Sequence, residues 1–235
     1  MLVVAVGVPG VGKTSVIKRV QEILEENGIK SQVINFGDVM KEILANVDRE
    51  KMRKLPVEEQ RKAQMEAARR INEIAKAFDG ITFVDTHIFI RTTEGYMSGL
   101  PSRVLEERGS DLKAIIVITA DPRDIRKRRQ RDSLEGKRVR EEYAAESEEV
   151  IAMHQQITIN GAVVASVMYG PLLIIAENEE GRLDKAAKLI ANNLINAFRR
   201  SSRCLNGFYF SLFPRSLLLL SMRYYASGDG KLGGI

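Results

Sequence analysis

The stretch Gly7-Val8-Pro9-Gly10-Val11-Gly12-Lys13-Thr14 decides the fold of this chain, because it is a complete G-x-x-x-x-G-K-[ST] phosphate-binding loop. An apolar run over 2–6 precedes it and a segment with helical spacing follows it, as the motif requires. Glycine lets the backbone approach a polyphosphate closely, and the helix that opens at Lys13 adds N–H donors and a positive dipole end. The pattern predicts that Lys13 reaches the β- and γ-phosphates of a nucleotide and that the Thr14 hydroxyl holds Mg²⁺.

Length and composition indicate a globular protein. The chain has 235 residues, enough for one domain with a sizeable core and a tail. A net charge of +5 suits nucleotides and nucleic acids equally well. The single cysteine excludes a disulfide framework or a thiolate metal site and favours a reducing compartment, so we expect the cytoplasm. The first apolar run breaks at Gly7, so we expect no signal peptide. The apolar stretches of residues 199–235 are shorter than the ~20 residues that a membrane span needs, so we expect no transmembrane span.

Short β-branched runs alternate with longer amphipathic segments, which indicates βαβ units around a parallel sheet. The predicted strands are 2–8, 32–36, 81–85, 114–119 and 172–176. The predicted helices are 13–27, 57–78, 121–131, 144–168 and 183–199. Because right-handed crossovers place helices on both faces, we expect an α/β fold with a five-stranded parallel sheet covered on both sides.

The carboxyl ends of such strands line one crevice where ligands bind. The phosphate loop and segments 85–87 and 120–122 follow predicted strands, so we expect them to converge. Asp85 stands where a Walker-B carboxylate reaches Mg²⁺ directly or through water. The alternative is a cap of a helix or turn. Two interpretations of His87 stay open, a contact with substrate and a solvated loop side chain.

A second functional signal is the arginine-rich segment 123–140, with arginines at 123, 126, 128, 129, 131, 138 and 140. Phosphoryl transfer depends on donors that neutralise the transferring group, and guanidinium forks suit this task. We interpret Arg128, Arg138 and Arg140 as phosphate contacts. Arg123 and Arg126 fit a solvated helix face that pairs partly with Asp124 and Glu135. No aromatic residue interrupts the run, which argues against a patch that binds nucleic acid.

Further segments occur in a fixed order along the chain, at 35–40, 48–55, 84–87, 90–92 and 95–101. Together with the phosphate loop they resemble the archaeal-type adenylate kinases, over about residues 1–198. The resemblance implies Mg²⁺-dependent phosphoryl transfer from ATP to AMP, which gives two ADP. It also implies a nucleoside monophosphate kinase fold with a small lid over about 128–143, and a homo-oligomer, often a trimer.

The same resemblance suggests roles for particular side chains. Arg53 matches the residue that holds the α-phosphate of AMP, although a surface position among neighbouring basic residues is the alternative. Arg91 matches a position between the two nucleotides. The remaining matches are Phe36, Gly37 and Met40 in the AMP pocket and Arg128, Arg138 and Arg140 in the lid. Gln60 and Gln64, on the following helix, are candidates for reading the adenine edge. No general base is required, because the attacking phosphate of AMP is already anionic.

The chain also departs from the family pattern. Arg138 and Arg140 follow what looks like a short insertion, so the length of the lid differs. Ile159 stands where relatives tend to carry an arginine, and Arg129 or Arg131 is a candidate to replace that contact. The resemblance stops after residue 198, and the C-terminal extension 199–235 is aromatic, then rich in glycine. We assign the extension no function, and a membrane surface, an oligomer contact and an unstructured appendage stay open for it.

Two other functions compete with an adenylate kinase. A kinase for a different nucleoside monophosphate shares the loop and the lid, so it is the nearest alternative. An adenylate-kinase-like ATP switch in RNA or ribosome assembly is the second. A GTPase is excluded, because no Asn-Lys-x-Asp motif follows a later strand.

Overall fold

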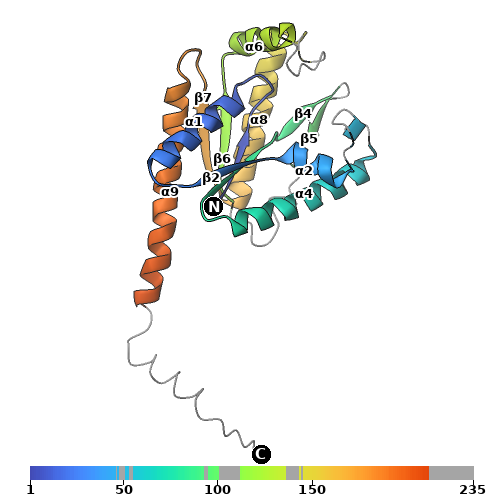
Figure 1. Ribbon diagram of the computed structural model, residues 1–235. Coiled ribbons are helices and arrows are strands. Elements are labelled where there is room, and N and C mark those ends of the chain that lie inside the picture. The colour runs from blue at the N-terminus through green and yellow to red at the C-terminus, as the bar shows by residue number, and fades with distance from the viewer. Residues whose placement is uncertain are drawn as a thin grey trace, which may run out of the picture. The chain divides into compact units, whose positions relative to one another are not determined.

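A computed structural model describes residues 1–45, 47, 51–52, 55–92, 95–100, 112–135, 143 and 145–211, the last eleven of these by backbone only. Its centre is a sheet of five parallel strands in the order β2-β3-β1-β6-β7 (Figure 1). The strands are β1 (Leu2–Val6), β2 (Ser31–Asn35), β3 (Ile81–Asp85), β6 (Leu112–Thr119) and β7 (Leu172–Glu177). The predicted five-stranded parallel sheet is confirmed.

Helices cover both faces of this sheet (Figure 1). They are α1 (Lys13–Glu26), α2 (Phe36–Ile43), α4 (Val57–Ala77), α6 (Pro122–Leu134), α8 (Glu148–Tyr169) and α9 (Leu183–Ser211). The helices α2, α4 and α8 share one buried cluster with the sheet. Figure 1 shows α1 and the first turns of α9 on the opposite face. The chain divides into two compact units, Met1–Ile195 and Asn196–Ile235.

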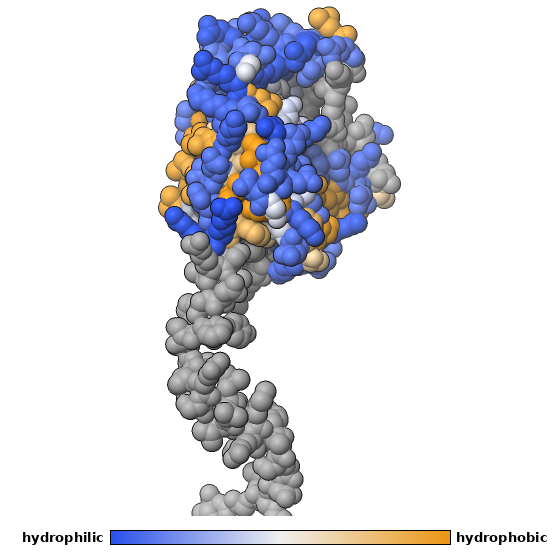
Figure 2. Space-filling view, turned by 60° about the vertical axis from the view of Figure 1, so that its left-hand side comes forward, coloured by the Kyte–Doolittle hydropathy of each residue, from blue (hydrophilic) through white to orange (hydrophobic). Residues whose placement is uncertain are grey.

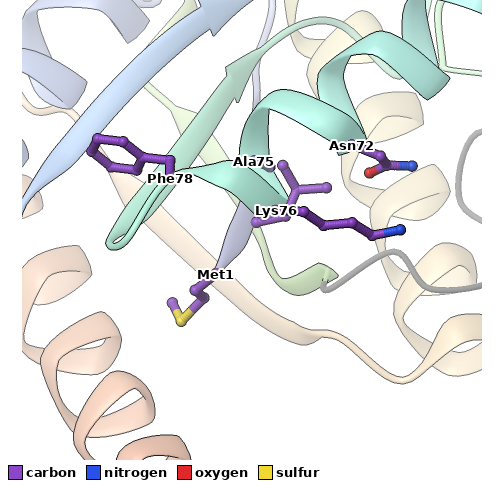
Figure 3. Close-up of a pocket in the computed structure, with 6 residues that line it drawn as sticks. Met1, Asn72, Ala75, Lys76 and Phe78 are labelled. Carbon is purple, nitrogen blue, oxygen red and sulfur yellow. The ribbon is translucent and has the colours of Figure 1, made fainter.

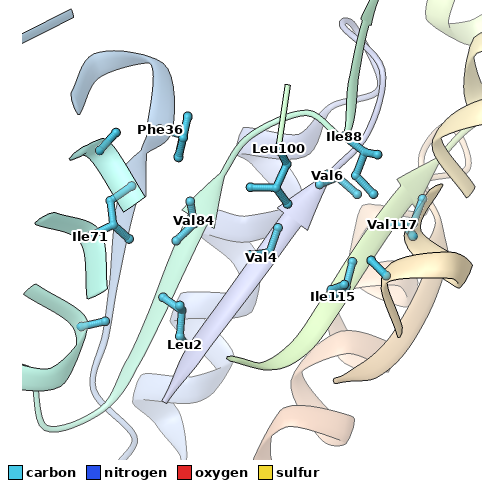
Figure 4. Close-up of a cluster of buried hydrophobic side chains, with 14 of the residues drawn as sticks. Leu2, Val4, Val6, Phe36, Ile71, Val84, Ile88, Leu100, Ile115 and Val117 are labelled. Atoms are coloured by element: carbon cyan, nitrogen blue, oxygen red, sulfur yellow. The ribbon is translucent and has the colours of Figure 1, made fainter. Parts of the chain in front are cut away.

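The core follows the two-residue alternation of the strands. Leu2, Val4 and Val6 of β1 point to the face that carries α2, α4 and α8, where Figure 4 shows them beside Val84 and Ile115 of the neighbouring strands. The intervening residues of β1 are buried as well. A strand that is buried on both faces is typical of the centre of a parallel sheet, which is why this run is apolar throughout.

The structure differs from the predicted elements in several places. Helix α2 and the antiparallel pair β4 (Phe89–Arg91) and β5 (Tyr96–Ser98) were not predicted, because they are too short to show a period. The first strand ends at Val6 rather than at residue 8, because the phosphate loop begins at Gly7. Helix α8 begins at Glu148 rather than at 144, because the Ser147 hydroxyl caps it by accepting from the N–H of Val150. Helix α9 continues past 199 to Ser211.

Helix α8 is long and apolar enough, by length and composition alone, to cross a membrane. A core helix of a globular domain passes the same test, and α8 buries Ile151, Ala162 and Ala165 in the domain. Two glutamates occupy its first turn. We therefore interpret α8 as a core helix with an apolar outer face.

A shallow hollow of about 200 Å³ lies at the amino end of β1, opposite the phosphate loop (Figure 3). Its lining comes from the start of β1 and the last turns of α4, with Met1, Asn72, Lys76 and Phe78 among the residues. Among the described residues that line it, Lys76 carries the one charged side chain. The described lining therefore offers no convergent set of catalytic groups.

Candidate active site

The phosphate loop connects β1 to α1 at the carboxyl edge of the sheet. Gly10 and Gly12 adopt left-handed backbone conformations, with φ of 82° and 88°. Gly12 is also the residue that caps α1, so the loop turns directly into the amino end of that helix. Only glycine adopts this conformation without strain, which is why the motif requires glycine at the position before Lys13.

Side chains from outside the loop hold its carbonyl groups. The carbonyl of Pro9 accepts a hydrogen bond from Arg129 Nε at 2.9 Å, and the carbonyl of Val11 accepts from Asn178 Nδ2 at 2.8 Å. Nδ1 of His87 lies 2.9 Å from the carbonyl oxygen of Gly7, which fits a tautomer that carries its proton on Nδ1. The carbonyls of Gly7, Pro9 and Val11 are every second one along the loop. Because side chains from outside the loop hold all three, the surrounding protein fixes the conformation of the loop.

Asn178 also explains why Gly12 has no room for a side chain. A Cβ built on Gly12 would lie 2.4 Å from Asn178 Nδ2, and one on Gly10 would lie 2.8 Å from Arg129 Cγ. The loop is therefore packed tightly between the end of β7 and helix α6. Asn178 is buried and follows β7 directly.

Lys13 and Asp85 meet at the carboxyl ends of β1 and β3. Lys13 Nζ lies 2.6 Å from Asp85 Oδ1 and donates to the carbonyl of Thr86 at 3.2 Å. Asn35 Nδ2 lies 3.5 Å from the other carboxylate oxygen of Asp85. The structure thus brings together the two side chains that the sequence assigned to phosphate and to metal, and it places both in a setting with little solvent.

The donor set fits a magnesium ion. Thr14 and Asp85 offer a hydroxyl and a carboxylate, and Mg²⁺ prefers such oxygen ligands, completed by waters and substrate phosphates rather than by an all-protein cage. The described part of the chain holds no group of three or more His, Cys, Asp or Glu side chains arranged for a metal.

Arg128 lies against the far end of the phosphate loop. Its guanidinium donates to the carbonyls of Val11 at 3.1 Å and of Asn178 at 3.3 Å, and pairs with Glu180 at 2.6 Å. The pKa of the Glu180 carboxyl is lowered, mainly by this hydrogen bond. Arg123 and Arg126 lie on a solvated helix face as predicted, and the acidic residues that they pair with are Asp121 and Glu148, which were not the predicted partners.

Arg91 and Arg129 share one carboxylate, that of Glu146. Arg91 Nη1 lies 2.5 Å from Glu146 Oε1 and Arg129 Nη1 lies 2.7 Å from Glu146 Oε2. The pKa of Arg91 is raised, mainly by its hydrogen bond to Glu146. The guanidinium of Arg129 also lies over the ring of Tyr143, 5.3 Å from its centroid. Two arginines from distant segments are thereby joined beside the phosphate loop.

The side chains predicted for the AMP pocket do not all lie in the same kind of environment. Phe36 lies in the buried cluster and Met40 packs against it, while the N–H of Gly37 donates to the Asn35 side chain that caps α2. Gln64 is buried and donates to the carbonyl of Ser98 at 3.4 Å. Ile159 packs against the same cluster. Arg53, Arg138 and Arg140 lie outside the described residues, so their predicted roles are unchanged by the structure.

Comparison with known proteins gives the family. A family model described as an AAA domain matches residues 6–151. An adenylate kinase from Sulfurisphaera tokodaii is 39% identical over 197 residues, which cover 82% of this chain and 98% of that protein. The chain belongs to the adenylate kinase family. Family members from Methanopyrus kandleri and Methanocaldococcus jannaschii are 41% and 38% identical, each over 80% of this chain and 94% of their own length.

A solved structure supports the fold alone. Shikimate kinase from Bacteroides thetaiotaomicron superposes with a TM-score of 0.51 at 12% identity, covering 83% of this chain and 98% of that one. An adenylate kinase and a shikimate kinase can share a phosphate-loop sheet while acting on different acceptors, so this likeness says nothing of the acceptor here.

Sequence reasoning missed three side chains of this adenylate kinase family site. The position of Asn178 could have been predicted from the sequence, because it follows the last predicted strand at the edge where ligands bind. No sequence pattern distinguishes Glu146, since it is one of several glutamates in a polar segment. Arg129 was noted only as a possible replacement for a missing arginine, and its contact with the phosphate loop comes from the folded structure.

We predict that Gly12→Ala lowers the affinity for ATP at least tenfold, because the new Cβ meets Asn178 and strains the cap of α1. Gly28→Ala is the matched control. Gly28 has a similar φ of 73° but open space around it, so this variant costs about 1–2 kcal/mol of folding free energy and leaves ATP affinity unchanged. Calorimetric titration with ATP, together with urea unfolding, measures both effects. Equal loss of affinity in both variants would contradict the role of Asn178.

Proposed function

We propose that this protein is an adenylate kinase that transfers the γ-phosphoryl group of ATP to AMP in a reversible, Mg²⁺-dependent reaction. The observation that carries the proposal is an intact phosphate loop, with Lys13 held beside Asp85, in a chain that spans nearly the whole length of its adenylate kinase relatives. A nucleoside monophosphate kinase needs a site for a polyphosphate, a metal and several convergent cations. The residues around the loop offer each of these.

Lys13 is proposed to exchange partners during the reaction. In the structure its ammonium group pairs with Asp85 at 2.6 Å. A polyphosphate in the loop offers Lys13 more negative charge than one carboxylate, so Lys13 would turn to the β- and γ-phosphates. Asp85 and Thr14 are then the residues that would hold Mg²⁺, which neutralises charge on the phosphate oxygens when bound.

The remaining arginines are proposed to bring the second nucleotide into line. Two polyphosphates repel each other, so positioned cations between them supply most of the rate enhancement. Arg91 is the proposed contact between the nucleotides and Arg53 the contact with the α-phosphate of AMP. Arg128, Arg138 and Arg140 are the proposed lid arginines. Arg128 already lies against the loop, where it donates to the carbonyl of Val11 and pairs with Glu180, whose side chain is largely exposed.

We propose that residues 1–198 form the whole kinase domain and that 199–235 is an appendage. The match to the relative from Sulfurisphaera tokodaii covers 82% of this chain, and a compact unit spans Met1–Ile195. We further propose a cytoplasmic location, which suits a chain with a single cysteine.

We also propose that the protein is a homo-oligomer, and the trimer implied by family resemblance is the expected form. An apolar surface supports this. Its members lie on α8, and all are exposed: Val163, Val164, Val167 and Met168. Exposed apolar patches mark interaction surfaces. By contrast, the upper end of the molecule, formed by α6, is almost entirely hydrophilic (Figure 2).

We predict that Lys13→Ala lowers turnover at least 10²-fold, since a cation that stabilises the transferring phosphoryl group is lost. Lys18→Ala, on the exposed side of the same helix, is the control and keeps wild-type turnover. A coupled assay measures transfer from ATP to AMP, CMP, UMP and GMP, with circular dichroism to confirm the fold. Near-normal turnover by Lys13→Ala would refute the assignment. Faster transfer to CMP, UMP or GMP than to AMP would show that the protein is a kinase for another nucleoside monophosphate.

We predict that a chain truncated after residue 198 retains kcat and KM for ATP and AMP within twofold. The kinase domain holds every side chain assigned to the reaction, so removal of the appendage leaves the site intact. The same coupled assay on the truncated and full chains tests this. A loss of turnover in a folded truncated protein would place part of the function in residues 199–235.

We predict that Val167→Glu dissociates the oligomer, because Val167 is 81% exposed in a single chain and a buried glutamate at an interface would lack a partner. Leu134→Glu is the matched control, since Leu134 is 90% exposed on α6, away from the apolar surface. Sedimentation velocity gives the oligomeric state of each variant. A monomeric wild type would overturn the proposed assembly.

A further inference from the structure

Glu146, which has no role in the reaction described above, lies at the centre of a cluster of charged side chains. Its side chain is 2% exposed, and each of its two carboxylate oxygens holds a different arginine. One partner, Arg91 of β4, is the arginine proposed to lie between the two nucleotides. The other, Arg129 of α6, is 5% exposed. A single carboxylate therefore joins the segment that carries Arg91 to the helix beside the phosphate loop.

Arg129 extends this connection to the loop itself. Its Nε donates to the carbonyl of Pro9 at 2.9 Å, and its Nη1 donates to the carbonyl of Tyr143 at 3.2 Å. Its Cγ lies so close to Gly10 that a Cβ there would stand 2.8 Å away. Pro9, Arg129, Glu146 and Arg91 thus form a continuous series of contacts from the phosphate loop to the other side of the site.

The arrangement of the charges holds the Glu146 side chain in place. A buried carboxylate between two guanidinium groups must stay in place, because either arginine left without it would be a buried or half-buried cation near a like charge. Arg91 uses Nη1 for Glu146 at 2.5 Å, yet 35% of its side chain is exposed. One end of its fork is therefore anchored while the side chain remains accessible to a ligand.

We propose that Glu146 is a positioning residue, which fixes Arg91 at a set place relative to the phosphate loop through Arg129 and thereby aligns it with the phosphoryl group in transfer. The inference rests on the proposed kinase function and deepens it. A misplacement of about 1 Å at a reacting centre costs about 10²-fold in rate, so a support of this kind affects catalysis without touching substrate.

The test separates positioning from a purely structural role. Glu146→Gln keeps the shape but removes the charge that two arginines need. We expect kcat to fall about 10- to 100-fold, with KM for ATP and for AMP within threefold of wild type, because an interaction made only in the transition state is lost. Glu148→Gln is the matched control, since Glu148 lies two residues on, is partly exposed and pairs with Arg126 at 3.5 Å. It keeps wild-type kcat.

A double-mutant cycle shows whether Glu146 acts through Arg91. In an Arg91→Met background, Glu146→Gln should lower kcat by less than twofold further, since the residue that it positions is gone. An additive loss in that background would overturn the proposal. Wild-type kcat for Glu146→Gln would overturn it as well, and so would a loss of stability with unchanged kcat per folded molecule.

Glu146→Asp covers the case in which Glu146→Gln does not fold. It keeps the negative charge next to Arg129 but is one methylene too short to reach both arginines. We expect it to fold and to lose at least tenfold in kcat with unchanged KM, and full activity would overturn the proposal.

If wild-type protein itself transfers no phosphoryl group to AMP, the proposed function fails first. If wild type is active and the Glu146 variants match it, only this inference fails.

Discussion

The structure depends on holding a glycine-rich loop in a single conformation. Glycine permits the close approach that a polyphosphate needs, but it also makes the loop costly to order, because it has the most conformational freedom to lose. The chain offsets this cost from outside the loop. Asn178 holds the carbonyl of Val11, and Arg129 holds that of Pro9. The sheet order places the ends of β1, β3 and β6 side by side, and the side chains that hold the loop come from segments that follow these strands and β7.

The described cations of the site are paired with carboxylates, and the pairs are of two kinds. The Lys13–Asp85 and Arg128–Glu180 pairs join a cation to one carboxylate, and Glu180 is largely exposed. A polyphosphate in the loop offers each of these cations more negative charge than its one carboxylate does. The pair of arginines on Glu146 is different, because this carboxylate is buried and serves both. Separating it would leave an uncompensated buried charge, so this part of the site is better suited to fix geometry than to exchange partners.

Much of the fold could be predicted from the sequence for a physical reason. A parallel strand buried on both faces must be apolar throughout, and its neighbouring helices must be amphipathic. Both patterns can therefore be recognised in the amino-acid sequence. The order of the strands indicated that the phosphate loop and Asp85 would lie at the same edge of the sheet, and in the structure Lys13 lies 2.6 Å from Asp85. Short elements such as α2 and the β4–β5 pair escaped prediction, because three to eight residues do not establish a period.

By itself the sequence determined the nucleotide-binding loop, the parallel sheet and the positions of Lys13, Thr14 and Asp85, since these depend on local pattern and on the order of strands. Only the tertiary structure decided which distant side chains support that loop. Asn178 lies 167 residues from Val11, and Glu146 lies 55 residues from Arg91. No local pattern distinguishes one glutamate among several as the buried one. Burial and charge pairing arise from how the helices pack on the sheet, so these contacts appear only when the chain is folded.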